Sequence, residues 1–223
     1  MALNINGKKI LHLIEKQVKV WEKEKTLQKE CKEKTKGMGP YIAISRHHGA
    51  GGTQIGQKLA NILNWSLYDQ EVVEYIATEA QVRKSVVQSF DEKVQSAIET
   101  WVLTLLNRHA LDKDHYLKHL SHVICSLAQH GNAIFIGRGA RFILPAEFGL
   151  RVQITAPLPV RIKNVMARHQ ISQSEAKRLI ERIDSQRVAY VRRTFHKDAD
   201  DLAYFDLVIN TATLTLEQAT QIN

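Results

Sequence analysis

Short apolar runs alternate along the chain with longer segments in which apolar residues recur every three or four positions. The runs are short enough for buried strands and cover residues 41–45, 65–69, 132–136, 150–154 and 206–210. The periodic segments predict helices over residues 54–63, 70–80, 82–110, 115–130, 159–166, 172–195 and 215–222. Strands that alternate with helices predict an α/β protein whose parallel sheet is covered by helices on both faces.

The first forty residues differ from the rest of the chain in pattern and in charge. Five apolar residues lie at helical spacing within residues 8–36 and predict an amphipathic helix: Ile10, Leu13, Ile14, Val18 and Trp21. A Gly-Met-Gly-Pro turn then separates an N-terminal extension, residues 1–40, from a domain, residues 41–223. The apolar stripe is expected to dock on the domain or on another subunit, and the second case predicts a homodimer. The alternative is a basic arm that binds a partner or a membrane surface.

Composition and charge narrow the class of protein. The chain has 44% hydrophobic and 24% charged residues, as in an ordinary globular protein. Of the net charge of +8, residues 1–40 carry +5 and residues 41–223 only +3. This mildly basic domain fits a pocket for an anionic small molecule and argues against a nucleic-acid partner. There is no apolar run of membrane-spanning length and no secretion signal, and Cys31 and Cys125 are expected to be free thiols, so we predict a cytoplasmic protein.

One stretch combines a strand, a glycine-rich turn and a helix. The strand over residues 41–45 leads into Arg46-His-His-Gly-Ala-Gly-Gly-Thr53, and helical spacing starts directly afterwards. The backbone amides of such a turn, together with the positive end of the helix dipole, can bind a phosphate. The glycines would allow its close approach, and Thr53 would cap the helix or bind Mg²⁺. The alternative is a turn that merely needs room.

This glycine loop departs at two positions from the phosphate-binding pattern G-x-x-x-x-G-K-[ST]. Arg46 stands at the first glycine, and Gly52 stands at the lysine that reaches the β- and γ-phosphates. The positions of other loops nevertheless favour phosphate binding. The loops at 46–53, 69 and 137–139 all follow predicted strands, and should meet at the carboxyl edge of the sheet, where such sheets bind ligands.

A second informative stretch is the arginine-rich helix predicted near the C-terminus. Its charged residues include Arg178, Arg182, Asp184, Arg187, Arg192 and Arg193. Asp184 and Arg187 are three positions apart and therefore share a face of the helix. A carboxylate there can accept from ribose hydroxyls while the guanidinium binds phosphate oxygens. The alternative is a solvated helix with an ordinary ion pair.

Six short motifs occur in order along the domain and together carry a resemblance. They are Ser45–Thr53, Tyr68-Asp69, Gly137-Arg-Gly139, Ala156-Pro157, Asp184-Ser-Gln-Arg187 and Phe205–Thr211. As a set they resemble the cytidylate kinase-like family, whose members are related to the bacterial CMP kinases among the P-loop nucleoside monophosphate kinases. The resemblance covers about residues 41–220 and excludes the N-terminal extension.

The resemblance implies a P-loop NTPase three-layer fold. It implies a five-stranded parallel sheet with helices on both faces, here with the N-terminal helical extension added. It also implies an acceptor-side helical insertion over about residues 70–130 and a lid-like arginine-rich helix over about residues 170–200.

The resemblance also implies roles for individual residues. The ATP phosphates would be held by Gly49, Ala50, Gly51, Gly52 and Thr53, with Thr53 as the Mg²⁺ ligand. The acceptor nucleotide would be bound by Asp69, Arg138, Asp184 and Arg187. The positive charge that the missing lysine would supply could come from Arg46, Arg187 and Arg192, which are the candidate catalytic residues. Arg193 is the alternative to Arg192 as the arginine of the lid.

The predicted reaction is transfer of the γ-phosphoryl group of ATP to a pyrimidine, CMP-like nucleoside monophosphate. CMP kinases carry a lysine where this chain has Gly52 and an aspartate where it has Gly139. The replacement of the lysine leaves open an alternative, a nucleotide-binding protein with lost or altered kinase activity. A third hypothesis is a module that binds nucleic acid or a partner through the lysine-rich extension.

Overall fold

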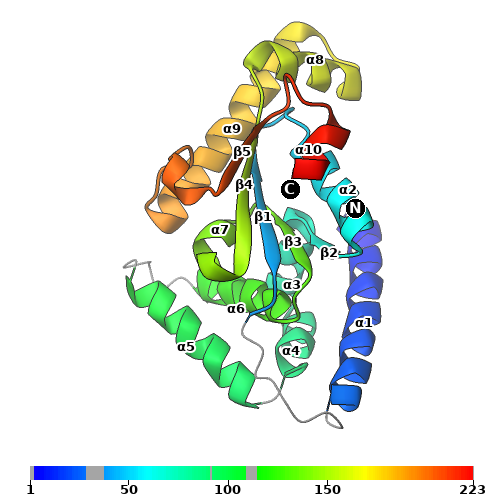
Figure 1. Cartoon of the computed structure of the whole chain (residues 1–223), viewed down its shortest axis with the longest axis vertical. Coiled ribbons are helices and arrows are strands. Elements are labelled where there is room, and N and C mark those ends of the chain that lie inside the picture. Colours follow the sequence, from blue (N-terminus) through cyan, green and yellow to red (C-terminus); the bar gives the residue numbers. More distant parts are fainter. Residues whose placement is uncertain (1–2, 29–37, 91, 109–114, 223) are drawn as a thin grey trace.

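A five-stranded parallel sheet forms the centre of the molecule (Figure 1). The computed structural model describes residues 3–28, 38–90, 92–108 and 115–222. The strands are β1 (Tyr41–Arg46), β2 (Ser66–Tyr68), β3 (Ala133–Ile136), β4 (Gly149–Thr155) and β5 (Leu207–Asn210). Their order across the sheet is β2-β3-β1-β4-β5, and each pair of neighbours is parallel.

Helices connect the strands and precede the first of them. They are α1 (Leu3–Gln28), α2 (Gly52–Leu63), α3 (Gln70–Thr78), α4 (Ala80–Gln88), α5 (Glu92–Arg108), α6 (His115–Gln129), α7 (Ala140–Ile143), α8 (Leu158–His169), α9 (Gln173–Phe195) and α10 (Leu216–Ile222). Two short 3-10 turns, η1 (Ala146–Phe148) and η2 (Leu202–Tyr204), lie before β4 and β5. The short α7 and both 3-10 turns are elements that the periodicity did not predict.

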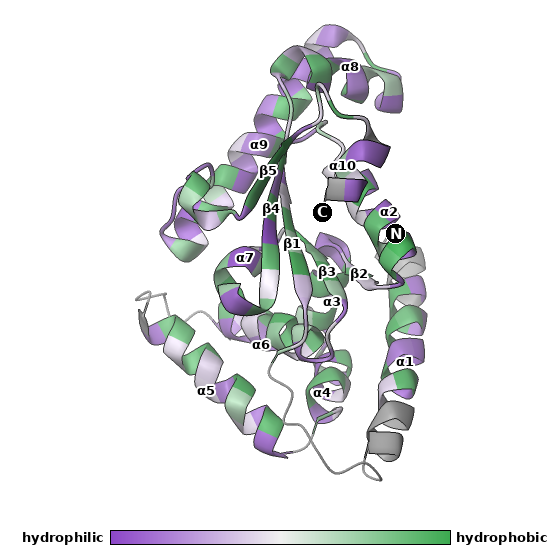
Figure 2. Ribbon diagram, viewed as in Figure 1, coloured by the Kyte–Doolittle hydropathy of each residue, from purple (hydrophilic) through white to green (hydrophobic). Residues whose placement is uncertain are grey.

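The two faces of the sheet bury two separate clusters of apolar side chains. Ile42 and Ile44 of β1 point into a cluster with residues of α2 and α10. Tyr41 and Ala43, which alternate with them, point into a larger cluster with residues of α3 to α7. Apolar and polar residues alternate along α1 and α5, as expected of helices that cover a core on one side (Figure 2). The predicted parallel sheet with helices on both faces and an N-terminal helix is confirmed.

Helix α1 docks on its own domain. Ile14 and Trp21 are buried, and α1 contacts α3 and α4. The indole of Trp21 stacks on the His130 ring with the centroids 3.6 Å apart. Leu13, predicted in the same stripe, is instead 61% exposed, because it lies to one side of the contact. The prediction that this stripe forms a homodimer is not supported, since the same chain covers most of it. Residues 29–36 of the predicted helix lie outside the described residues.

The single helix predicted over residues 82–110 is wrong, because α4 and α5 are separate. The Ser89 hydroxyl donates to the Val86 carbonyl at 2.6 Å and contacts His130 Nε2 at 2.9 Å. Phe90 stacks on the other face of the His130 ring, with centroids 4.2 Å apart. These contacts stop α4 and turn the chain, although the apolar spacing continues across the break.

The stability of this junction should depend on pH. Burial between the two rings lowers the pKa of His130 to about 3, below its ordinary value near 6.5. The unfolded chain therefore binds a proton more readily than the folded one. The contribution is complete above pH 6.5 and is lost as the pH falls toward 3, by up to about 1.4 kcal/mol per pH unit. Urea unfolding at pH 7 and pH 5 should show a smaller loss of stability in His130→Phe than in the wild type or in the exposed control His12→Gln. Equal losses in all three proteins would contradict this.

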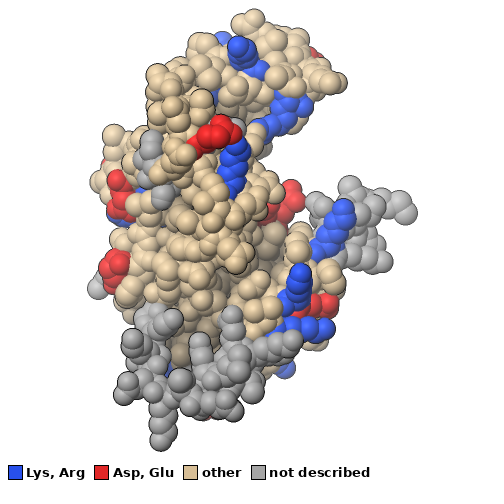
Figure 3. All heavy atoms as spheres, turned by 45° about the vertical axis from the view of Figure 1, so that its right-hand side comes forward, with Lys and Arg blue, Asp and Glu red and all other residues tan. Residues whose placement is uncertain are grey.

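Two further expectations, free cysteines and the absence of a membrane span, underlie the predicted cytoplasmic location. Cys125 is a free, buried cysteine of α6, and burial raises its pKa to about 12, while Cys31 lies outside the described residues. None of the described helices combines the length and apolar content that a membrane span requires. On the face shown in Figure 3, basic side chains stand apart from one another and do not form one continuous patch.

Candidate functional site

The glycine loop lies at the carboxyl edge of the sheet, at the upper end of the strands in Figure 1, near α8 and α9. Gly49 and Gly51 have φ angles of 83° and 85°, in the left-handed region that favours glycine. A Cβ at Gly49 would also lie 2.7 Å from the Arg161 carbonyl oxygen of α8. The loop thus needs room, as the simpler alternative held, but the same glycines also leave its backbone open.

The carbonyl groups of three consecutive loop residues are held from outside by other elements. The Asn164 amide of α8 donates to the Gly49 carbonyl at 2.9 Å, and the Thr211 hydroxyl after β5 donates to the Ala50 carbonyl at 2.9 Å. Arg161 of α8 donates to the His48 carbonyl at 3.4 Å. In a trans peptide the following N–H points the opposite way, so the Gly51 amide is turned away from Thr211. The Ala50 amide, in contrast, donates to the His47 carbonyl at 3.2 Å. The orientation of the Gly51 amide is typical of an anion-binding nest.

Arg46, the last residue of β1, crosses the loop between two glycines. A Cβ at Gly52 would lie 2.6 Å from Arg46 Cβ, and a Cβ at Gly137 would overlap Arg46 Nη1. The guanidinium therefore lies over the turn that follows β3. Its Nε is buried without a hydrogen-bond partner among the described residues. Burial, and the nearby positive charge of Arg187, lower the pKa of Arg46 to about 9, so it stays charged at neutral pH.

Helix α9 is fastened to the loop by the predicted pair. Asp184 Oδ1 accepts from the His48 amide at 2.8 Å, and Oδ2 accepts from Arg161 Nη1 at 2.5 Å. Arg187 Nη1 donates to the Arg46 carbonyl at 3.0 Å and lies 3.7 Å from Asp184 Oδ1. The two side chains share a face of α9, as expected from their spacing, but in this structure the Asp184 carboxylate binds protein donors. Its role in ribose binding stays a prediction.

The other predicted acceptor-side residues, Asp69 and Arg138, are close enough to shift the pKa of Arg46. Asp69 caps α3 by accepting from the Val72 amide at 3.0 Å, and its charge raises the pKa of Arg46. Arg138 pairs with Glu74 of α3 and lies 5.4 Å from the centre of the Tyr190 ring of α9. The structure thus brings Asp69, Arg138, Asp184 and Arg187 around Arg46.

Two predicted site residues, Thr53 and Arg192, are solvent-exposed. Exposure is compatible with ligand binding but is equally common for ordinary surface residues. Thr53 lies in the first turn of α2, and Arg192 lies in the last turn of α9.

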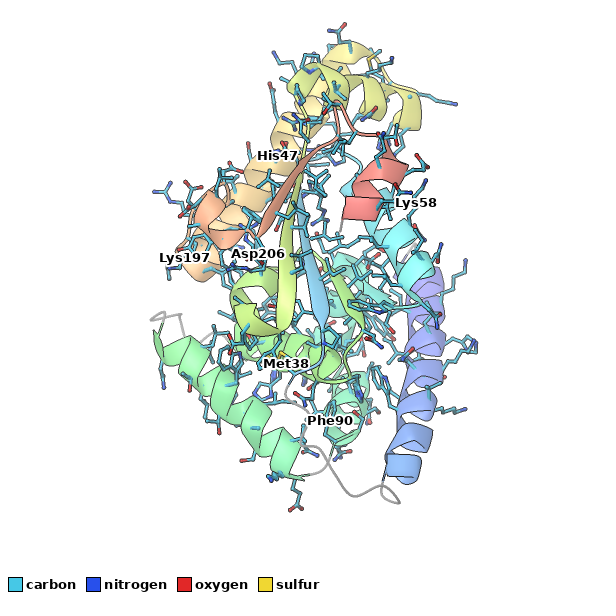
Figure 4. The ribbon with its side chains drawn as sticks, in the orientation of Figure 1. Met38, His47, Lys58, Phe90, Lys197 and Asp206 are labelled. Atoms are coloured by element: carbon cyan, nitrogen blue, oxygen red, sulfur yellow. The ribbon has the colours of Figure 1, made fainter. Side chains whose placement is uncertain are left out.

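His47, next to Arg46, lies at the upper end of the strands beside α9 (Figure 4). Its ring contacts Thr155 Oγ1 at 2.9 Å and Asp200 Oδ1 at 3.3 Å, which ties the segment after α9 to the loop.

Gly139 is explained by its surroundings. It has a φ of 69°, and a Cβ there would overlap the ring of Phe195. Phe195, the last residue of α9, is buried and packs on Phe142 and Tyr190. The aspartate of the CMP kinases is therefore incompatible with this position of α9.

Sequence reasoning missed the residues that support the loop from outside. Thr211 stood within the C-terminal motif but had no predicted role, and Arg161 and Asn164 stood in no motif. The sequence shows that Arg161 and Asn164 are three positions apart on one predicted helix. It does not show that this face of the helix packs on the glycine loop. Glu74, the partner of Arg138, was likewise unmarked.

Comparisons with known proteins agree with this architecture. The model of the cytidylate kinase-like family matches residues 41–213. A cytidylate kinase from Methanocaldococcus jannaschii is 34% identical over 96 residues, which cover 41% of this chain and 53% of that protein. The match thus spans about half the length of that relative. A cytidylate kinase from Ignicoccus hospitalis is 26% identical over 175 residues, which cover 78% of this chain and 90% of that protein.

A solved structure shares the fold. The crystal structure of an uncharacterized protein from Eubacterium ventriosum superposes with a TM-score of 0.56 at 20% identity, covering 82% of this chain and 94% of that one. The family match extends from β1 past β5 and includes the glycine loop, Arg138, Asp184 and Arg187. The chain belongs to the cytidylate kinase-like family.

Proposed function

We propose that the chain is a nucleotide kinase that transfers the γ-phosphoryl group of ATP to a pyrimidine, CMP-like nucleoside monophosphate. The observation that carries this proposal is the meeting of a glycine loop, whose carbonyls are held outward, with the cations Arg46 and Arg187. A loop of this kind binds anions through its amides, and two arginines at its side suit the negatively charged oxygens of a phosphoryl group in transfer.

The donor phosphates would be held by the amides of residues 49–53. Thr53 is the candidate protein ligand of Mg²⁺, which when bound would neutralise charge on the phosphate oxygens. The exposed hydroxyl of Thr53 fits this role, because Mg²⁺ commonly takes only one or two protein ligands and fills its shell with phosphate and water. The described residues hold no group of three or more His, Cys, Asp or Glu that could bind a metal by themselves. That finding suits an ion brought by the nucleotide.

The acceptor would lie between the loop and the helical insertion over about residues 70–130. Arg138 and Arg187 would bind its phosphate, and Asp69 and Asp184 would accept from its base or ribose. Arg138 would have to share its guanidinium between this phosphate and Glu74. The segment over about residues 170–200 would act as the lid, with Arg192 near its end.

In this reaction the protein would position the two substrates and stabilise negative charge. An oxygen of the acceptor phosphate forms a bond to the γ-phosphorus, and the bond from that phosphorus to the β–γ bridging oxygen breaks. ADP leaves with the bond's electron pair, and the acceptor becomes a diphosphate. Arg46 and Arg187 would stabilise the charge on the transferring group, and a closed lid would exclude water that could otherwise take it.

A coupled assay for ADP across CMP, UMP, dCMP, AMP and GMP tests this function. We expect turnover with at least one pyrimidine monophosphate and little without an acceptor. No ADP above the background of a protein-free control, with any acceptor, would contradict it. The second candidate, a nucleotide-binding protein that does not transfer phosphate, is favoured by Gly52 in place of lysine. Calorimetric binding of ATP without turnover would identify that case.

The outer support of the loop should matter for ATP. Thr211→Val keeps the shape of the side chain but removes the hydrogen bond to the Ala50 carbonyl. Because a hydrogen bond of this kind contributes about 0.5–1.5 kcal/mol, ATP should bind roughly two- to twelvefold more weakly by calorimetry if the bond is needed for the bound form of the loop. Thr213→Val is the matched control, because Thr213 is an exposed residue of the same turn after β5. Equal affinities of the two variants would show that this support is irrelevant to binding.

A further inference from the structure

We propose that Arg46 and Gly52 have exchanged roles relative to the phosphate-binding pattern: the cation sits at the loop's first position, and its side chain is what requires glycine at the seventh. The inference rests on the proposed function for its ligand, the triphosphate of ATP. It extends the sequence-based suggestion that Arg46 supplies charge, because it explains both departures from the pattern by one contact.

The first step is steric. A Cβ at Gly52 would lie 2.6 Å from Arg46 Cβ, 3.0 Å from Arg46 Cγ and 3.5 Å from Ile154 Cβ. The nearest of these atoms is fixed to the strand backbone and cannot rotate away, unlike the end of a long side chain. Any side chain at residue 52 would therefore have to move β1 or α2. As long as residue 46 carries a Cβ, a lysine at residue 52 therefore requires such a shift.

The second step is the position of the charge. From β1 the Arg46 side chain passes Gly52 at the start of α2 and reaches Gly137 after β3, where a Cβ would overlap Nη1. The side chain thus runs from the start of α2 to the turn after β3, and a lysine at residue 52 would begin on the same path. Arg187 donates to the Arg46 carbonyl, so this second cation is held at the backbone of residue 46.

The third step is the uncompensated donor. Arg46 Nε is buried without a hydrogen-bond partner among the described residues. A buried charged donor without a partner is costly, and the negative charge of a phosphate bound beside this guanidinium would offset part of that cost. At Gly137 the missing side chain likewise leaves room for the other end of the guanidinium, and the φ of 82° favours glycine there as well.

The exchange makes a reciprocal prediction. Changing both residues, R46G/G52K, recreates the pattern G-x-x-x-x-G-K-T over residues 46–53. By calorimetry with ATP and Mg²⁺, R46G alone should bind about 10- to 100-fold more weakly than the wild type. G52K alone should bind at least as weakly, and R46G/G52K should recover to within about tenfold of the wild type. R46K serves as the variant that keeps a cation on the strand.

A second measurement needs no nucleotide. G52A adds only a Cβ, so it should lower the midpoint of urea unfolding in the wild-type background and change it little in the R46G background. This coupling between residues 46 and 52 tests the steric part even where a lysine variant folds poorly.

The outcomes separate the two proposals. Wild-type binding of ATP that is unchanged in R46G, or a G52A effect that is equal in both backgrounds, overturns the exchange but leaves the proposed function standing. Wild-type protein that binds no ATP overturns the proposed function, and with it the role of the Arg46 charge. Weakened single variants with a recovered double variant support the exchange.

Discussion

Replacing Arg187 by alanine should lower turnover about a thousandfold and leave the protein folded. Its guanidinium lies beside the loop, 3.0 Å from the Arg46 carbonyl and 3.7 Å from the Asp184 carboxylate. Burial lowers the pKa of Arg187, and the Asp184 carboxylate opposes that shift and so favours the charged form. An arginine that contacts a transferring phosphoryl group can contribute about 10³–10⁵ in rate, and we take the lower limit because Arg46 remains.

The measurement is the turnover number in the coupled assay at saturating ATP and acceptor. Arg182→Ala, an exposed arginine of the same helix, is the matched control and should retain full turnover. Arg187→Lys should fall between the two, because lysine keeps the charge but cannot form a bidentate contact. If Arg187→Ala is no slower than Arg182→Ala, the transferring group does not meet this helix.

Placing the aspartate of the CMP kinases at residue 139 should destabilise the protein by about 2–6 kcal/mol. Gly139 has a φ of 69°, where glycine is favoured over aspartate, and its Cβ would overlap the buried ring of Phe195. Strained backbone and overpacking each cost roughly 1–3 kcal/mol. The free energy of unfolding from urea titrations of Gly139→Asp measures the sum.

Two controls separate the causes of that loss. Asn64→Asp places the same charge at another position of positive φ, at the exposed end of α2, and should cost under about 1 kcal/mol. Gly139→Asp combined with Phe195→Ala should be less destabilising than the sum of the two single changes, because the second removes the clash. Strict additivity would mean that Phe195 is not the obstacle.

The strand β3 was predictable because burial inside a parallel sheet makes it a continuous apolar run. The start of α9 was predicted at residue 172, and it depends on local contacts only, since Ser172 and Glu175 each accept from the other's backbone amide. The break at Ser89 was not visible, because what ends α4 is the ring of His130, which lies 41 positions away. Local patterns indicate local structure, and this turn is imposed by tertiary contact.

The candidate site divides in the same way. The glycines, Arg46 and the pair of Asp184 and Arg187 carried signals of their own in sequence. Asn164 and Thr211 carried none, because an amide or hydroxyl that supports a backbone carbonyl is recognised only when the two elements are seen to meet. The reason for glycine at residue 52 could not be predicted either, because it depends on the path of the Arg46 side chain.

The central claim is that a glycine loop without its lysine holds the triphosphate of ATP with the help of Arg46. A crystal structure with a non-hydrolysable ATP analogue and Mg²⁺ tests it most directly. The account predicts β- and γ-phosphate oxygens within hydrogen-bond distance of the amides of residues 49–53 and of the Arg46 guanidinium. A loop that stays empty at saturating analogue, or a nucleotide bound with its phosphates away from Arg46, would contradict it.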